Sequence, residues 1–379
     1  MCAMLHPMRH LLVLLAVLFT SSQALPAQQQ GTDPEALLRR GITEQQQGDY
    51  NSAIRDYREY LKVQPDAVQA EMNLGAALAH IGQYDEAITL YRKALPSLTY
   101  KNPVLLNLGL AYYKKTDFND AHEQFEALQK LEPRNLQVAT LLGDCDVKLG
   151  RPQDAIDLLQ PLDTEGSKNL DFQYVLGTAL IRAGHLRDGV KRIENVAQSS
   201  NSADSYQLAG ATLLQLNEYE SARRDLEAAL RLDPKLPNIY TLVGEARDKT
   251  GATAEAESAF LQALQLSPDD FEANLYVGAI LYKRRDLDKA RLYLEKAVKL
   301  RPRDPMARYE SALLKSATGQ YDAAALDLEQ LVKEDPQWLE PHVELASLYY
   351  KLHRPQDGAK EREIVDRITA EQQQHGPGK

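Results

Sequence analysis

Cysteine is almost absent from this sequence, which has only Cys2 and Cys145 among 379 residues. Cys2 lies in a leader segment described below, so Cys145 is left as a lone thiol if that segment is removed. A single thiol cannot form an intramolecular disulfide. A fold stapled by disulfides is therefore excluded.

An excess of positive charge is also missing. Lys and Arg together number 44 against 54 Asp and Glu, which gives a formal net charge of −10. Because nucleic acid is bound through a basic surface, it is not expected as a partner. The same deficit disfavours flat attachment to anionic lipid.

The residue patterns of known catalytic sites are missing too. Six histidines lie outside the leader, and none is spaced from another His, a Cys or a carboxylate cluster as metal ligands are. Asp144, Cys145 and Asp146 are adjacent, but consecutive residues point in different directions on a helix. There is no phosphate-binding glycine loop and no nucleophile elbow. We expect no catalytic residue, no metal site and no cofactor, and predict that the chain is not an enzyme.

Long apolar runs are limited to one, Leu11–Phe19. A basic pair at residues 9–10 precedes it, and a zone of small residues that ends at Ala27 follows it. This order is typical of a secretory signal peptide, and the run is too short for a stable membrane anchor. We predict a signal peptide at 1–27, a linker at 28–33, and export to the periplasm or the cell exterior. Cleavage after Ala24, an uncleaved or buried helix, and a later start at Met4 or Met8 are the alternatives.

What the sequence does contain is a repeat. Pairs of residues that include a glycine recur every 34 residues, with one residue lost after the fifth pair. The pairs are Arg40-Gly41, Leu74-Gly75, Leu108-Gly109, Leu142-Gly143, Leu176-Gly177, Ala209-Gly210, Val243-Gly244 and Val277-Gly278, and Ala312 and Ala346 continue the period. Twelve residues after each comes Ala or Gly, and in most repeats a large apolar residue follows four residues later.

Each repeat has the features of two helices joined by a turn. Apolar residues fall three and four apart in both halves, as on one face of a helix. Glycines such as Gly48 and Gly82 suit a left-handed cap after the first helix, and prolines such as Pro65 and Pro133 end the second. One such pair cannot bury its own apolar face, so neighbouring pairs must stack.

With these features the sequence resembles the tetratricopeptide repeat family. The small pair eight residues into the repeat, the aromatic residue soon after it (Tyr112, Tyr349), the alanine where the helices cross and the closing proline carry the resemblance. It implies an all-α fold, a right-handed α-solenoid of stacked antiparallel helix pairs. The regular repeats and the leader favour a secreted or periplasmic bacterial type.

Ten repeats are predicted over residues 34–372, followed by a disordered tail at 373–379. Their bounds are 34–67, 68–101, 102–135, 136–169, 170–202, 203–236, 237–270, 271–304, 305–338 and 339–372. The fifth repeat is one residue short and has Gly189 where alanine is usual, and the fourth ends in a Thr-Glu-Gly-Ser stretch instead of proline. We expect weaker stacking and faster hydrogen exchange around 163–203.

The resemblance also implies where partners bind. In this family the first helix of each pair lines a concave groove through repeat positions 2, 5, 9, 12 and 13. Applied here, together with two asparagines that share one position in adjacent repeats, this rule gives the candidates Leu38, Ile42, Met72, Asn73, Leu106, Asn107, Leu110, Tyr113, Leu275, Tyr282, Tyr309, Leu313, Val343 and Tyr350. The middle repeats are polar and acidic at these positions. The opposing reading is that these tyrosines are merely typical of the family.

Two functions remain open from the sequence. The first is a non-catalytic scaffold of the cell envelope that binds a peptide or helix of a protein partner in the groove. The second is a structural subunit of an envelope or secretion machine that contacts partners through its ends and outer faces.

Overall fold

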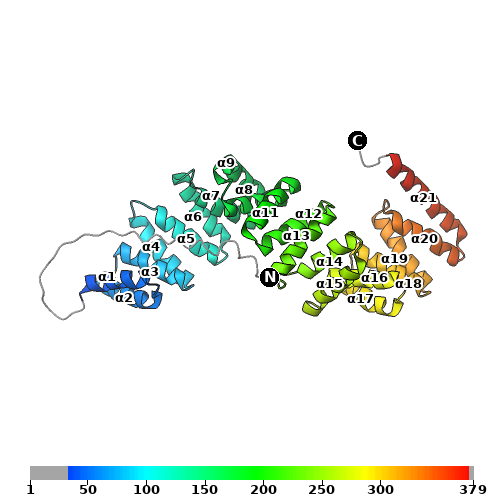
Figure 1. Cartoon of the computed structure of the whole chain (residues 1–379), viewed down its shortest axis with the longest axis horizontal. Helices are drawn as coiled ribbons and strands as arrows, with labels where there is room; N and C mark the ends of the chain where they lie inside the picture. Colours follow the sequence, from blue (N-terminus) through cyan, green and yellow to red (C-terminus); the bar gives the residue numbers. More distant parts are fainter. Residues whose placement is uncertain (1–32, 375–379) are drawn as a thin grey trace. The chain divides into compact units, whose positions relative to one another are not determined.

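The structure is a computed structural model that describes residues 33–374. Within that range the chain consists of helices joined by short turns, and no residue is in a strand (Figure 1). The predicted all-helical fold is confirmed. The predicted signal peptide, all but the last residue of the linker, and tail residues 375–379 lie outside the described residues. The last helix continues through Gln374, past the predicted start of the tail at 373.

The helices pair in sequence order, and each repeat contributes a first and a second helix. The first helices are α1 (Pro34–Gln46), α3 (Val68–His80), α5 (Asn102–Lys114), α7 (Leu136–Lys148), α10 (Leu170–Arg182), α12 (Ala203–Gln215), α14 (Ile239–Lys249), α16 (Phe271–Lys283), α18 (Pro305–Ala317) and α20 (Leu339–Lys351). The second helices are α2 (Tyr50–Val63), α4 (Tyr84–Ala94), α6 (Phe118–Leu131), α8 (Pro152–Leu159), α11 (Leu186–Ser200), α13 (Tyr219–Leu232), α15 (Thr253–Leu266), α17 (Leu287–Leu300), α19 (Tyr321–Glu334) and α21 (Pro355–Gln374). Short 3₁₀ segments η1 (Leu95–Ser97) and η2 (Gln160–Leu162) and the one-turn α9 (Asp163–Gly166) complete the described chain.

The repeat bounds read from the sequence agree closely with these helices. All but one of the first helices begin at the first residue of a predicted repeat. The exception, α14, begins two residues late because Asn238 has a φ of 60°, which is not helical. The closing prolines each lie two residues past the end of a second helix, as Pro65 does after Val63.

By its contacts the chain divides into two compact parts. The N-terminal part extends through Thr212 and the C-terminal part begins at Leu213, so the boundary falls within α12. In Figure 1 the first part runs from blue into green and the second from green to red.

In at least seven of the ten repeats, a large side chain of the second helix lies over a glycine at position 8 of the first helix. A Cβ placed on Gly109 would lie 2.5 Å from Phe125 Cε1, and one on Gly75 would lie 2.7 Å from Tyr91 Cε1. Real Cβ atoms do not approach other atoms this closely, so the backbone of the first helix touches the ring directly. The alanine four residues before the ring, Ala121 or Ala87, is fully buried. This contact sets the spacing of the helix pair.

The turn between the two helices uses a left-handed residue at position 15 of every repeat. Six of these residues are the glycines that the sequence marked as caps, Gly48, Gly82, Gly150, Gly184, Gly251 and Gly319, with φ between 76° and 90°. The other four are Thr116, Asn217, Arg285 and His353, with φ between 58° and 65°. The following residue closes the turn, as Asp117 does by donating its N–H to the Tyr112 carbonyl at 3.0 Å.

The irregular stretch between the fourth and fifth repeats is closely packed. In place of a closing proline the chain forms η2 and α9, where Asp163 accepts hydrogen bonds from Arg192 at 2.6 and 2.8 Å. A Cβ on Gly189 would lie 2.7 Å from the Gly177 carbonyl oxygen, so glycine is required there by the close approach of α10 and α11. The faster hydrogen exchange expected around 163–203 stays a prediction.

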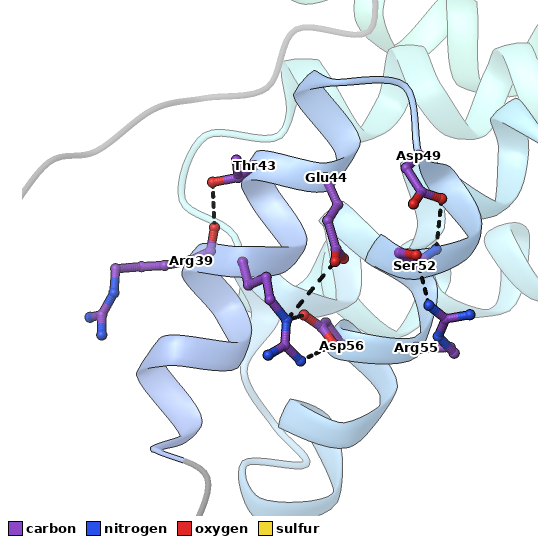
Figure 2. Close-up of polar contacts among 8 residues, drawn as sticks. Arg39, Thr43, Glu44, Asp49, Ser52, Arg55 and Asp56 are labelled. Atoms are coloured by element: carbon purple, nitrogen blue, oxygen red, sulfur yellow. Dashed lines mark hydrogen bonds and ion pairs between the residues drawn. The ribbon is translucent and has the colours of Figure 1, made fainter.

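Charged side chains of the first repeat are used to hold its own two helices together. The Arg40 guanidinium of α1 bonds to the Asp56 carboxylate of α2, with Nη2 2.6 Å from Oδ1, and its Nε lies 3.9 Å from Glu44 Oε1 (Figure 2). Asp49 caps α2 by accepting the N–H of Ser52 at 3.1 Å (Figure 2). These groups have a structural role.

The turn geometry gives a prediction for stability. Thr116 is β-branched and has a φ of 65°, a conformation that costs an L-residue about 1–2 kcal/mol. Thr116→Gly should therefore raise the free energy of unfolding by about 1 kcal/mol, measured by urea denaturation. Gly82→Thr, at the same position of another repeat and with no atom within 4 Å of an added Cβ, should lower it by a similar amount. Equal stability of both variants and the parent would contradict this account of the turn.

Candidate partner-binding surfaces

The fourteen candidate groove residues lie on first helices of both parts, and the structure gives them different degrees of exposure. Leu38, Ile42, Met72, Asn73, Leu106, Asn107, Tyr282 and Tyr309 are half-buried, Val343 and Tyr350 are exposed, and Leu110, Tyr113, Leu275 and Leu313 are buried. The four buried residues belong to the core and offer a partner little surface.

Tyr113 shows why the family's groove positions can include a buried residue. Its hydroxyl donates a hydrogen bond to Asp144 on α7, the next first helix. Lys148 Nζ lies 3.5 Å from Asp144 Oδ2 and 5.8 Å from the centre of the Tyr113 ring. Burial, and then the charge of Asp144, raise the pKa of the Tyr113 hydroxyl far above its ordinary value. Tyr113 therefore joins two neighbouring repeats.

Tyr350 is exposed, yet part of its ring faces the last helix instead of open solvent. The Arg362 guanidinium of α21 lies 5.6 Å from the ring centre. A Cβ on Gly358 would lie 2.9 Å from Tyr350 Cε2, so the glycine at that position makes room for the ring. Tyr350 helps to hold α21 against α20.

In the N-terminal part, four apolar side chains of the first helices α1, α3 and α5 are only partly buried. Leu38, Ile42, Met72 and Leu106 all pack against the same buried cluster while part of each stays accessible. We call these four residues the apolar face. Asn73 beside them accepts a hydrogen bond from Gln69 Nε2 at 3.0 Å, within its own helix.

In the C-terminal part, rings and carboxylates gather on α16, α18 and α20. Tyr309 and Trp338 have ring centres 5.3 Å apart. The charge of Glu344 acts on both Tyr282 and Tyr309, and that of Glu310 does the same. We call Tyr282, Tyr309, Trp338, Glu310 and Glu344 the acidic aromatic face. All five are half-buried.

Burial of this face perturbs its titratable groups. Burial raises the pKa of the Glu310 carboxyl above its ordinary value, although the charge of Lys283 acts in the opposite direction. Burial also raises the pKa of the Tyr309 hydroxyl, and the charges of Glu344, Glu310 and Glu340 raise it further. Among the described residues no ion pair within 4.0 Å engages Glu310 or Glu344. The two carboxyl groups are thus held partly out of water without a close cation in the described chain.

Three of these five residues were not among the sequence candidates. Glu310 and Glu344 lie at repeat position 6, one residue past the groove position that was considered, and Trp338 precedes the first turn of α20. Adjacent Tyr-Glu at 309–310 and the single tryptophan were the available signals.

Groups with potential reactivity elsewhere are occupied or buried. Cys145 is fully buried, and burial raises the pKa of its thiol strongly. His342 is buried, with Nδ1 2.6 Å from Glu361 Oε2 and Nε2 3.2 Å from the Pro336 carbonyl oxygen, so it links α20 to α21. No group of three or more His, Cys, Asp or Glu within residues 33–374 is arranged to hold a metal ion. Over the same residues no helix is both long and apolar enough to cross a membrane.

The burial of Glu310 gives a prediction with a defined sign. Because its pKa in the folded chain is above the ordinary 4.5, the folded state holds the proton to higher pH, and burial opposes folding once the group ionises. Glu310→Gln should therefore raise the urea midpoint near pH 7, and this gain should shrink as the pH falls toward about 4.5 and be absent below it. Trp338 fluorescence reports the transition, and Glu295→Gln on the exposed side of α17 is the control. A lower midpoint for Glu310→Gln near pH 7 would refute this reading.

Comparison with known proteins identifies the repeat. A family model described as tetratricopeptide repeat matches residues 38–101, 174–237, 208–271 and 244–305, together more than half of the chain. A second model, for anaphase-promoting complex, cyclosome, subunit 3, matches residues 80–162.

Individual relatives are distant. Anaphase-promoting complex subunit 3 of Schizosaccharomyces pombe is 23% identical over 288 residues, which cover 74% of this chain and 43% of the relative. A TPR repeat-containing protein of Methanocaldococcus jannaschii is 25% identical over 322 residues, covering 76% and 55%. A protein CTR9 homolog of Arabidopsis thaliana is matched over 28% of its length, so the chain spans between about a quarter and just over half of these relatives.

Among solved structures, the crystal structure of the APC/C hetero-tetramer Cut9-Hcn1 aligns with a TM-score of 0.50 and 15% identity, covering 89% of this chain and 73% of that one. This likeness shows the fold. Proteins with these repeats generally mediate protein–protein interactions and scaffolding. With ten helix pairs in register and a family model matching most of them, the chain belongs to the tetratricopeptide repeat family.

Proposed function

We propose that this chain is a non-catalytic scaffold that binds a segment of a protein partner on its first helices. The apolar face carries the proposal. Three consecutive first helices place Leu38, Ile42, Met72 and Leu106 in one cluster with part of each side chain accessible. Accessible apolar surface that is shared by neighbouring elements is typical of sites that bind other proteins. A partner helix or extended segment would cover it with its own apolar side chains.

Export belongs to the same proposal. The leader at 1–27 supports a scaffold that works in the periplasm or outside the cell, and bacterial origin is proposed with it. The net charge of −10 supports a protein partner over a nucleic acid.

An observation on the second helices supports the alternative, an assembly subunit that uses its outer faces. Leu292 of α17 and Leu326 of α19 occupy the same position in adjacent repeats and are 67% and 68% exposed. By its name, the Schizosaccharomyces pombe relative is a subunit of a larger complex. The two functions differ in the face that a partner covers.

Introducing charge on one face distinguishes the two functions. The double substitution Met72→Glu and Leu106→Glu places two carboxylates on the apolar face and should abolish capture of crosslinked partners from the cell envelope, because desolvating each charge opposes binding. Val63→Glu with Leu131→Glu is the matched control, since these residues are 58% and 57% exposed at the ends of second helices of the same part. The control should capture the same partners as the parent.

Circular dichroism has to show equal helicity for both double variants. Loss of the same partners in both, or retention by the Met72 and Leu106 variant, would contradict binding through the apolar face. Loss in a variant that carries Glu at Leu292 and Leu326 would instead favour the assembly subunit.

A further inference from the structure

Several rings of the C-terminal part are already covered by cations of the chain itself. The Arg301 guanidinium lies 4.1 Å from the centre of the Phe271 ring, and that of Arg354 lies 4.3 Å from Tyr349. Lys351 and Arg362 lie 5.4 and 5.6 Å from the rings of Tyr321 and Tyr350. Cations over rings are thus a recurrent contact of this part, and the two shortest distances belong to arginine.

The rings of the acidic aromatic face differ from these. Within residues 33–374 no lysine or arginine lies over Tyr282, Tyr309 or Trp338, although all three rings remain partly accessible. Tyr309 and Trp338 are tilted by 46° to each other with centres 5.3 Å apart, so they present two ring surfaces at one place.

Two carboxylates lie beside these rings without a cation. Glu310 is on α18 with Tyr309, and Glu344 is on α20 and acts on Tyr282 of α16 as well as on Tyr309. The charge of Lys283 acts on Glu310 and that of Arg285 acts on Tyr282, but neither side chain forms an ion pair with Glu310 or Glu344 in the described chain. Negative charge from two helices therefore converges on an aromatic surface.

We infer that the acidic aromatic face is a subsite for an arginine side chain of the bound partner. A guanidinium can stack on Tyr309 or Trp338 while its N–H groups donate to Glu310 and Glu344, and its planar shape and weak hydration suit it to this combination better than an ammonium. A protein segment with a basic residue also complements the charge of this chain, which is −10. The inference rests on the proposed function, in that it names one side chain of the partner, but it concerns a different face from the one tested above.

The sequence supplies an intrinsic reporter for this site. Trp338 is its only tryptophan, so the tryptophan emission of the full chain comes from the acidic aromatic face alone. The probe is a synthetic peptide of Gly-Ser-Arg-Leu repeats, which contains no aromatic residue, and the matched peptide has citrulline in place of arginine. Citrulline keeps the shape of the side chain and removes its charge.

The parent chain should bind the arginine peptide with a saturable change in Trp338 emission and at least roughly tenfold more tightly than the citrulline peptide at low salt. Glu310→Gln with Glu344→Gln should abolish that preference. Glu295→Gln with Glu363→Gln, which removes the same charge from exposed positions of α17 and α21, should retain it. A lysine peptide should bind several-fold more weakly than the arginine peptide because it cannot stack as a plane.

Two results would overturn the inference. One is an equal change in Trp338 emission, or no change, when the parent chain is mixed with the arginine peptide and with the citrulline peptide. This result is obtained without any substitution in the protein. The other is an arginine preference that is the same in both double variants, which would mean that the charge of the whole chain, and not this site, attracts the peptide. Either result leaves the test of the apolar face unaffected, because that test uses Met72 and Leu106 of the other part.

Discussion

The contact on which the rest of the structure depends is the one between a ring or branched side chain of the second helix and the backbone of the first, which at least seven of the ten repeats make. At Gly109 and Gly75 there is no room for a Cβ beneath Phe125 and Tyr91. With the small residue fixed at position 8 and the large one sixteen residues later, the turn between them must reverse the chain within a few residues. Every repeat does so with a left-handed residue at position 15, and four of them accept a non-glycine residue there. The closeness of the pair therefore outweighs the local cost at Thr116 and Arg285.

The same contact decides which surfaces are left for function. The large residue of the second helix is used inside the pair and is not available to a partner, whereas the first helices carry apolar and aromatic side chains that stay partly accessible. In the N-terminal part these are the apolar residues around Met72 and Leu106, and in the C-terminal part they are rings with carboxylates around Tyr309 and Glu310. The two parts thus carry different kinds of side chain on their first helices, although both are built from the same repeat. Burial raises the pKa of the Glu310 carboxyl and so opposes its ionisation, a pattern that is common among residues of binding sites.

Much of the fold could be predicted from the sequence because the period is carried by residues with strong local effects. The 34-residue spacing of small residues placed nearly every first helix at its correct start, and the prolines placed the ends of second helices. The exception at α14 arose from Asn238, whose left-handed conformation has no sequence signal as strong as a glycine. The caps at Thr116 and Arg285 were missed for the same reason. Gly189 was taken as a sign of weaker stacking between repeats, which stays a prediction; within its own repeat this glycine lets α10 and α11 approach closely.

The candidate binding surfaces were less predictable, because the position of a residue within its repeat does not show which side chains of the next repeat lie beside it. Tyr113 is buried and donates a hydrogen bond from its hydroxyl to Asp144 of the following repeat, and Tyr350 is partly covered by Arg362. Trp338 and Glu344 became candidates only because α16, α18 and α20 bring them near Tyr309.

The central claim, that partners bind on first helices, is tested most directly by site-specific photocrosslinking in the native cell. A photoreactive amino acid would replace Leu106 or Val343 on first helices, and Leu131 or Leu326 on second helices. The account predicts discrete protein adducts from the first-helix positions and none from the second-helix positions, and adducts confined to Leu131 or Leu326 would contradict it.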